Sequence, residues 1–100
     1  MKVRFVSTTQ QEVRDAFDWY EKEMPGVGYK FLEQLDRTVQ RIAHYPESCA
    51  EYSKEIRRAL LNRFPYGLWY CAERDEIVVY AVAHLHRQPR HWIDRNPSSK

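Results

Sequence analysis

The chain has 100 residues, of which 43% are hydrophobic and 14% aromatic. That is enough for one domain to bury its own core without cross-links, so we expect a single domain over residues 1–100. No stretch approaches the roughly 20 apolar residues of a membrane span, and the first residues contain no apolar run of signal-peptide length. The two cysteines, Cys49 and Cys71, match no metal or redox spacing. These features argue against membrane and disulfide-rich secreted proteins, and we expect a cytoplasmic chain with reduced thiols.

The formal net charge of +2 is unevenly distributed along the chain. Residues 1–55 carry 8 Lys or Arg against 10 Asp or Glu, a balance of −2. Residues 56–100 carry 8 against 4, a balance of +4, together with three of the four histidines. Residues 88–100 form a polar C-terminal tail that contains two prolines. The basic C-terminal half favours an acidic or polyanionic partner.

The first part of the chain predicts a short strand followed by a helix. Val3 and Phe5 predict the strand. Thr9 and Glu12 are three positions apart, which is the spacing of a capping box and predicts a helix start. The apolar residues that follow recur at helical spacing and form one face of this helix: Val13, Ala16, Phe17, Tyr20 and Met24.

The segment Pro-Gly-Val-Gly at residues 25–28 ends the first helix, and a second helix is predicted from about residue 29 to 44. Pro46 stops this second helix. Two helices of similar length with a four-residue connection are expected to lie antiparallel as a hairpin. Residues 47–55 hold few apolar side chains and predict a surface loop. The apolar stripe of the second helix comprises Leu32, Leu35, Val39, Ile42 and Ala43.

Three consecutive strands are predicted within residues 56–89. Residues 68–73 and 77–84 are rich in Trp, Tyr, Val and Ile, and the polar residues 74–76 join them as a hairpin. A Phe-Pro-Tyr-Gly segment at residues 64–67 separates them from the preceding strand. The predicted fold is therefore α+β with the order β-αα-βββ, an antiparallel helical hairpin packed on a mainly antiparallel four-stranded sheet.

The last of these strands predicts two largely apolar faces, so we expect it inside the sheet rather than at an edge. If it continues to residue 86, His84 and His86 share a face. Strict alternation directs Ile77, Val79, Ala81 and Ala83 to one side and Val78, Tyr80, Val82 and His84 to the other.

Two groups of basic residues flank the predicted strands. Arginine suits phosphate recognition, because its planar guanidinium donates several hydrogen bonds. An ordinary solvated sheet edge is the alternative, since charges also discourage edge pairing. Alternation places Arg57 and Arg58 on opposite faces. The first group is Arg57, Arg58 and Arg63 with Lys54, and the second is Arg87, Arg90 and Arg95.

His84 and His86 precede Arg87, which is a combination suited to metal-free RNA cleavage. Such cleavage needs a base, an acid and a cation at the phosphate, and histidine titrates near neutral pH. Tyr80 or Tyr66 could assist. In the alternative interpretation, His84 is a hydrogen-bonded residue at a strand end and His86 a loop residue.

Two further patterns point to packing rather than to chemistry. Trp92 could stack on a base, but closure over a core edge is the commoner role, and Trp19 and Tyr20 suit helix–sheet packing. A zinc site from His84, His86 and His91 lacks a fourth ligand, so we expect no metal and no cofactor.

Several short motifs, in their order and spacing, resemble the ParE/RelE toxin superfamily over nearly the whole chain. They are Trp19-Tyr20, Pro25-Gly26-x-Gly28-x-x-Phe31-Leu32, Arg63-Phe64-Pro65-Tyr66 and Ala81-Val82-x-His84-x-x-Arg87-x-Pro89-x-x-Trp92. The resemblance implies a small β-αα-βββ toxin of a type II toxin–antitoxin module. It also implies a cognate antitoxin, encoded beside the toxin, whose C-terminal segment wraps and neutralises it.

The superfamily implies two targets. Members that look like ParE poison DNA gyrase, whereas members similar to RelE cut mRNA in the ribosome with basic sheet residues and a Tyr or His near the C-terminus. The nuclease pattern maps to Arg58 or Arg63 and to His84 or Arg87. The sheet has only Lys54 near it, and the tail resembles plasmid-stabilisation proteins of the ParE type, so gyrase is favoured over the mRNA endonuclease. A third alternative is an inactive member kept as a binding or repressor partner.

We therefore expect the helix pair to cover one side of the sheet and the other side to be free for a macromolecule. Arg58, Arg63, His84 and Arg87 are expected on that free side, as catalytic residues only if the protein is a ribonuclease. The residues expected to bind a target are Arg57, Arg58, Arg63, His84, His86, Arg87, Trp92 and Arg95.

Overall fold

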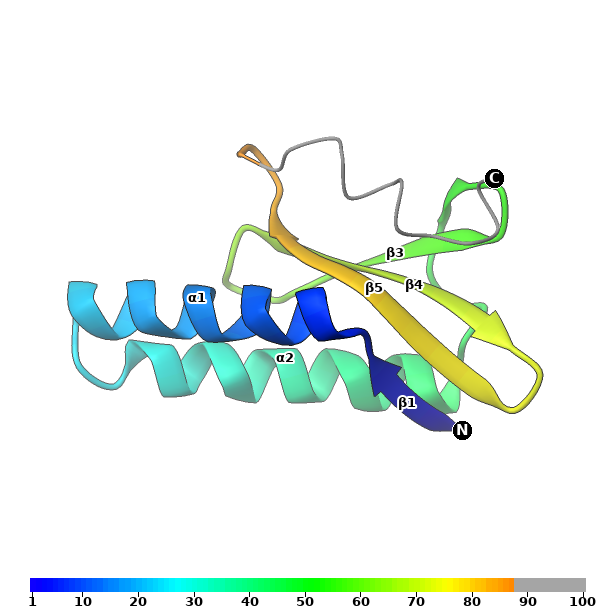
Figure 1. Ribbon diagram of the computed structural model, residues 1–100, viewed down its shortest axis with the longest axis horizontal. Helices are drawn as coiled ribbons and strands as arrows, with labels where there is room; N and C mark the ends of the chain where they lie inside the picture. Colours follow the sequence, from blue (N-terminus) through cyan, green and yellow to red (C-terminus); the bar gives the residue numbers. More distant parts are fainter. Residues whose placement is uncertain (88–100) are drawn as a thin grey trace.

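A helical hairpin covers one face of a five-stranded sheet in the computed structural model, which describes residues 1–87 (Figure 1). The sheet order is β1-β5-β4-β3-β2, with β1 parallel to β5 and every other pair antiparallel. The α+β class and the helical hairpin are confirmed. The elements are β1 (Lys2–Phe5), α1 (Ser7–Glu23), α2 (Val27–His44), β2 (Glu51–Ser53), β3 (Ile56–Leu60), β4 (Tyr66–Glu73) and β5 (Glu76–His84).

The sheet has five strands where four were predicted. The extra strand, β2, lies in the segment expected to be a loop and pairs with β3 at the edge of the sheet. Only Tyr52 of its three residues packs inward, with its ring 5.7 Å from that of Trp69. A polar three-residue strand has too little periodicity to be read from sequence, and short polar strands are typical of sheet edges.

Helix α1 begins two residues before the predicted capping box. Val6 is the N-cap and has no side-chain cap, while its N–H still donates to the carbonyl of Val79 in β5. Strand β1 therefore runs directly into the helix, and Thr9 is fully buried in the first turn. The capping-box prediction was wrong because the paired end of β1, rather than a polar side chain, starts the helix. Glu12 instead accepts a hydrogen bond from β5.

The turn between the helices depends on two glycines and one carboxylate. Gly26 has a φ of 97°, a left-handed conformation that favours glycine. The Glu21 carboxylate, on α1, accepts the N–H groups of Gly26 and Gly28 at 2.8 Å each and thereby caps the start of α2. A Cβ on Gly28 would lie 2.6 Å from Glu21 Cγ and 2.8 Å from Phe17. Gly28 therefore allows the two helices to approach closely.

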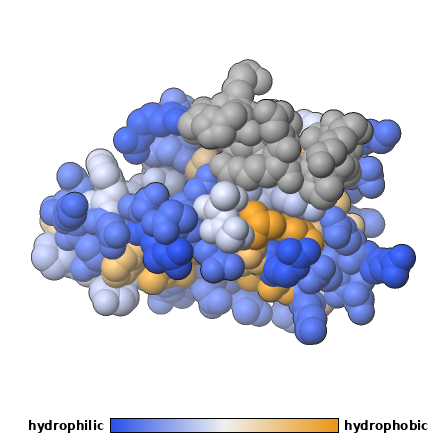
Figure 2. Space-filling model, in the orientation of Figure 1, coloured by the Kyte–Doolittle hydropathy of each residue, from blue (hydrophilic) through white to orange (hydrophobic). Residues whose placement is uncertain are grey.

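The main core lies between the helical hairpin and the sheet. The outer surface of the molecule on the side of the helices is mostly hydrophilic in Figure 2, where apolar side chains form only small patches. Every apolar side chain buried here contributes roughly 1.5–3 kcal/mol to folding. Its members include Phe31, Leu35 and Ile42 from α2, Leu68 and Tyr70 from β4, and Ile77, Val79 and Val82 from β5.

A β-bulge in β5 reverses the predicted alternation of the strand. Trp69 pairs with Ala81 and Tyr70 with Val79, so Tyr80 is the extra residue that the register skips. One extra residue in a strand moves every later side chain to the other face. As a result Val82 joins Ile77 and Val79 in the main core, while Ala81 and Ala83 join the opposite face. The predicted grouping was correct for residues 77–80 and wrong from residue 81 onward.

The face of the sheet away from the helices carries its own apolar cluster. Trp69 is fully buried there, against Ile56, Ala81 and Ala83. A Cβ on Gly67 would lie 2.9 Å from the Trp69 ring. Small residues on β4 and β5 therefore provide the space that the indole occupies, and this face is not a simple basic surface.

We predict that Gly28→Ala lowers the free energy of unfolding by about 1–3 kcal/mol, because the added methyl group overpacks the contact with Glu21 and Phe17. Urea denaturation measures the change, and Lys30→Ala, at an exposed position of the same helix, is the matched control. Equal stability of the two variants would contradict the close approach at Gly28.

Candidate functional site

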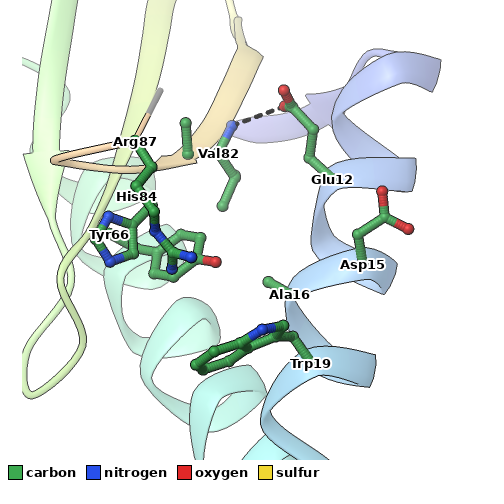
Figure 3. Close-up of a pocket in the computed structure, with 9 residues that line it drawn as sticks. Glu12, Asp15, Ala16, Trp19, Tyr66, Val82, His84 and Arg87 are labelled. Atoms are coloured by element: carbon green, nitrogen blue, oxygen red, sulfur yellow. Dashed lines mark hydrogen bonds between the residues drawn. The ribbon is translucent and has the colours of Figure 1, made fainter. Parts of the chain in front are cut away.

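A hollow of about 290 Å³ lies between α1 and the C-terminal end of β5 (Figure 3). Side chains from the two elements face each other across it, and Tyr66 at the start of β4 closes one end. The lining residues are Glu12, Asp15, Ala16 and Trp19 of α1, Tyr66 of β4, and Val82, Ala83, His84 and Arg87 of β5 and the turn after it.

The sequence builds this hollow by two local rules. The four residues of α1 follow the spacing i, i+3, i+4, i+7, which brings them to one side of the helix. The bulge at Tyr80 turns Val82 and His84 toward the same helix. Without the extra residue, Ala81 and Ala83 would lie on this side and His84 would lie on the opposite face of the sheet.

His84 is held in a defined orientation at the end of β5. Its Nδ1 accepts the N–H of His86 at 3.1 Å, and its ring makes an edge-to-face contact with Tyr66 at 5.4 Å between centroids. Burial, followed by the positive charges of Arg87 and His86, lowers the pKa of His84 below its ordinary value. His84 is therefore neutral at pH 7, and because Nδ1 is an acceptor, its proton resides on Nε2.

Arg87 provides the positive charge of the site. Its guanidinium carbon lies 5.5 Å from the centroid of the Trp19 ring, which is within range of a cation–π contact. Trp19, assigned to core packing from sequence, is 47% exposed. Burial raises the pKa of the Tyr66 hydroxyl, so that group stays protonated. The helix and the end of β5 are thus joined by a contact that leaves much of the indole accessible.

The predicted arginines do not share one face with His84. Arg57 points toward the helical side, where its Nη1 donates to the carbonyl of Cys49 at 2.6 Å. Arg58 lies on the opposite face, 5.7 Å from the ring centroid of Tyr52. The prediction that these two arginines occupy opposite faces is confirmed. The expectation of one free face bearing Arg58 and His84 together was wrong, because the bulge moves His84 to the helical side.

Arg63 lies in the connection between β3 and β4, at the same end of the sheet as His84. The N–H of Leu85 donates to the carbonyl of Pro65 at 2.8 Å, which holds this connection against the end of β5. Arg63, His86 and Arg87 are all exposed. The structure therefore brings Arg63, His84, His86 and Arg87 to one end of the sheet. The predicted contact residues Trp92 and Arg95, like the rest of the 88–100 tail, lie outside the described residues.

Sequence reasoning missed the side of the site that α1 contributes. Glu12 was assigned to a helix cap, and Asp15 was not singled out. The helical spacing of Glu12, Asp15, Ala16 and Trp19 was available as a signal. It becomes informative only once β5 is known to lie beside α1, and no pattern in either segment indicates that.

Two classes of site find no support in the part of the chain that the structure describes. Residues 1–87 contain no group of three or more His, Cys, Asp or Glu side chains placed to hold a metal ion. Neither described helix is long and apolar enough to cross a membrane.

The fold and the motifs along it define a toxin of the ParE/RelE superfamily. The chain belongs to the ParE toxin family of type II toxin–antitoxin systems (parDE), whose family model matches residues 3–89. A solved structure described as the chromosomal ParDE toxin–antitoxin system from P. aeruginosa has the same fold, with a TM-score of 0.74. The two chains are 15% identical, and the match covers 85% of this chain and 96% of the other. No curated protein matches the chain. Membership of the family implies a cognate antitoxin as partner.

We predict that Arg87→Ala raises the pKa of His84, because it removes one of the positive charges that lower it. NMR titration of the histidine ring resonances measures the shift. Arg63→Ala, which removes an exposed arginine that does not line the hollow, is the control. A His84 pKa unchanged by Arg87→Ala would contradict the electrostatic contact.

Proposed function

We propose that the protein arrests growth by binding DNA gyrase and is neutralised by its antitoxin. Family membership supports the toxin–antitoxin part of this proposal. The observation that supports binding over catalysis is the state of His84, whose two ring nitrogens are both committed: one accepts the His86 amide, and the other carries the proton.

A ribonuclease mechanism would need a base able to take a proton from the 2′-hydroxyl. His84 could do so at Nδ1 only after breaking the hydrogen bond that this nitrogen accepts from the His86 amide. Of the arginines named for the phosphate, Arg58 lies on the other face of the sheet, whereas Arg63 and Arg87 lie at the same end of the sheet as His84. The alternative of a ribosome-dependent mRNA endonuclease is therefore less well supported by the described residues than a binding function.

The end of the sheet offers a surface suited to an acidic target. Arg63, His86 and Arg87 are exposed there, and Arg87 lies over an indole that is itself half exposed. Arg and Trp side chains are the residues most often found at energetically important contacts in interfaces. We therefore assign the target contact to this end of the sheet and not to Arg57 or Arg58.

We predict that the purified protein inhibits supercoiling by gyrase and traps cleaved plasmid DNA. Arg87→Ala should raise the concentration needed about tenfold, the effect of losing roughly 1.4 kcal/mol of contact energy. Lys54→Ala removes a charge near the other end of β3 and is the matched control. Normal supercoiling at micromolar toxin would overturn the gyrase assignment.

The two other functions predict different results. If the protein is an mRNA endonuclease, His84→Ala abolishes new transcript ends in intoxicated cells, and gyrase remains active. If it is an inactive binding or repressor partner, expression without its antitoxin produces no growth defect.

A further inference from the structure

The turn that follows β5 is held to the end of the strand by a hydrogen bond that a titratable ring accepts. The N–H of His86 donates to the Nδ1 of His84 at 3.1 Å. The N–H of Leu85 donates to the carbonyl of Pro65 at 2.8 Å, and the N–H of Arg87 reaches the carbonyl of His84 at a longer 3.4 Å. Because residues 86 and 87 are exposed, the direction of their side chains depends on these main-chain bonds.

The ring of His84 can accept the bond from His86 only in its neutral form. A neutral imidazole has one acceptor nitrogen and one N–H, whereas both nitrogens of the charged ring carry a proton and accept nothing. A proton on Nδ1 would place the N–H of the ring and the N–H of the His86 amide against each other. The bond to the turn and a positive charge on His84 therefore exclude one another.

The groups on the two sides of the ring carry opposite charges. On the side of the turn, the ring of His86 lies 5.7 Å from that of His84 between centroids, and Arg87 adds a second cationic group. Across the hollow, two carboxylates line the wall that α1 forms (Figure 3). The titratable and charged side chains around the ring and the hollow are Glu12, Asp15 and Tyr20 of α1, Tyr66 of β4, and His86 and Arg87 of the turn.

We propose that His84 is a pH-dependent switch for the turn that carries His86 and Arg87. The neutral ring holds the turn against the end of β5. The charged ring loses the bond, is repelled by the cationic groups of the turn, and is attracted by the carboxylates of the α1 wall. The contact of Arg87 with Trp19 belongs to the surface assigned to the target, so its regulation by pH rests on the proposed function, whereas the release of the turn does not.

The direction of the pH dependence follows from the surroundings of the ring. Burial, and then the positive charges of Arg87 and His86, lower the pKa of His84 below its ordinary value of about 6.5. The bond is therefore complete at pH 7 and is lost as the pH falls through the lowered value. The unfolded chain takes up this proton at a higher pH than the folded chain, so acidification also lowers the free energy of unfolding. Burial raises the pKa of both Tyr20 and Tyr66, and these two hydroxyls stay protonated throughout.

NMR of the full chain between about pH 8 and pH 5 tests the switch without any partner. The main-chain amide resonance of His86 should shift with the same midpoint as the ring resonances of His84. Its hydrogen exchange, corrected for the intrinsic dependence on pH, should become at least about tenfold faster once the ring is charged, because the amide loses its acceptor. An amide of His86 that stays unchanged while the ring titrates would overturn the proposal.

Two substitutions assign the titration to one ring. His84→Asn keeps an acceptor, because an Asn side-chain oxygen can bind the N–H two residues further on, but this side chain does not titrate. The amide of residue 86 should then be independent of pH. His86→Asn keeps the main-chain N–H and removes the neighbouring ring, so the amide should still titrate. A titration that persists in His84→Asn, or that disappears in His86→Asn, would overturn the role of His84.

Binding to immobilised gyrase connects the switch with the proposed function. The original protein should bind about tenfold more weakly at about pH 5.5 than at about pH 7.5, whereas the affinities of His84→Asn at the two pH values should agree within about twofold. Equal pH dependence of the two proteins would overturn the regulation of target binding. Absence of binding at either pH would overturn the gyrase assignment and leave the amide titration as it stands, and so the two failures are distinguishable.

Discussion

The bulge at Tyr80 decides which side chains of the second half of β5 meet the helices. Strand β5 has nine residues and two apolar faces. Its Val and Ala side chains can be buried on either side of the sheet, so they do not decide which face each residue takes. His84 does not have that freedom, because its ring packs on Tyr66 and its Nδ1 orders the turn that carries His86. One inserted residue therefore places a polar end of the strand beside α1 and makes a hollow there.

The two walls of that hollow have opposite character. Helix α1 contributes Glu12 and Asp15, and the end of β5 contributes Arg87 with a neutral His84. Trp19 bridges the walls through its contact with Arg87. Acidic and basic side chains thus meet within one small hollow.

The fold was largely predictable because its elements are long or strongly patterned. The stripe of α2 and the Trp-, Tyr- and Val-rich strands β4 and β5 are such patterns, and the opposition of Arg57 and Arg58 follows from alternation alone. The strand β2 was too short and polar to be recognised. The start of α1 was misjudged because Val6, which directly follows β1 and still donates its N–H to Val79 of β5, is the N-cap of the helix.

The site was less predictable because it joins segments far apart in the chain. Alternation correctly described residues 77–80, but nothing in a run of Val, Tyr and Ala marks an inserted residue, so the side reached by His84 could not be derived. The contribution of α1 depends on its position beside β5, and periodicity contains no information about which element lies next to which. Trp92 and Arg95 lie outside the described residues, so their roles stay predictions.

The hydrogen bond between Glu12 and Val82 joins residues 70 positions apart, whereas Glu21 ties the helical hairpin together over only 5 to 7 positions. Local contacts form before distant ones, so the hairpin can assemble while the C-terminal strands are still being synthesised. The wall contributed by β5 arrives last. A chain still on the ribosome can therefore contain the finished helical hairpin before the hollow between α1 and β5 exists.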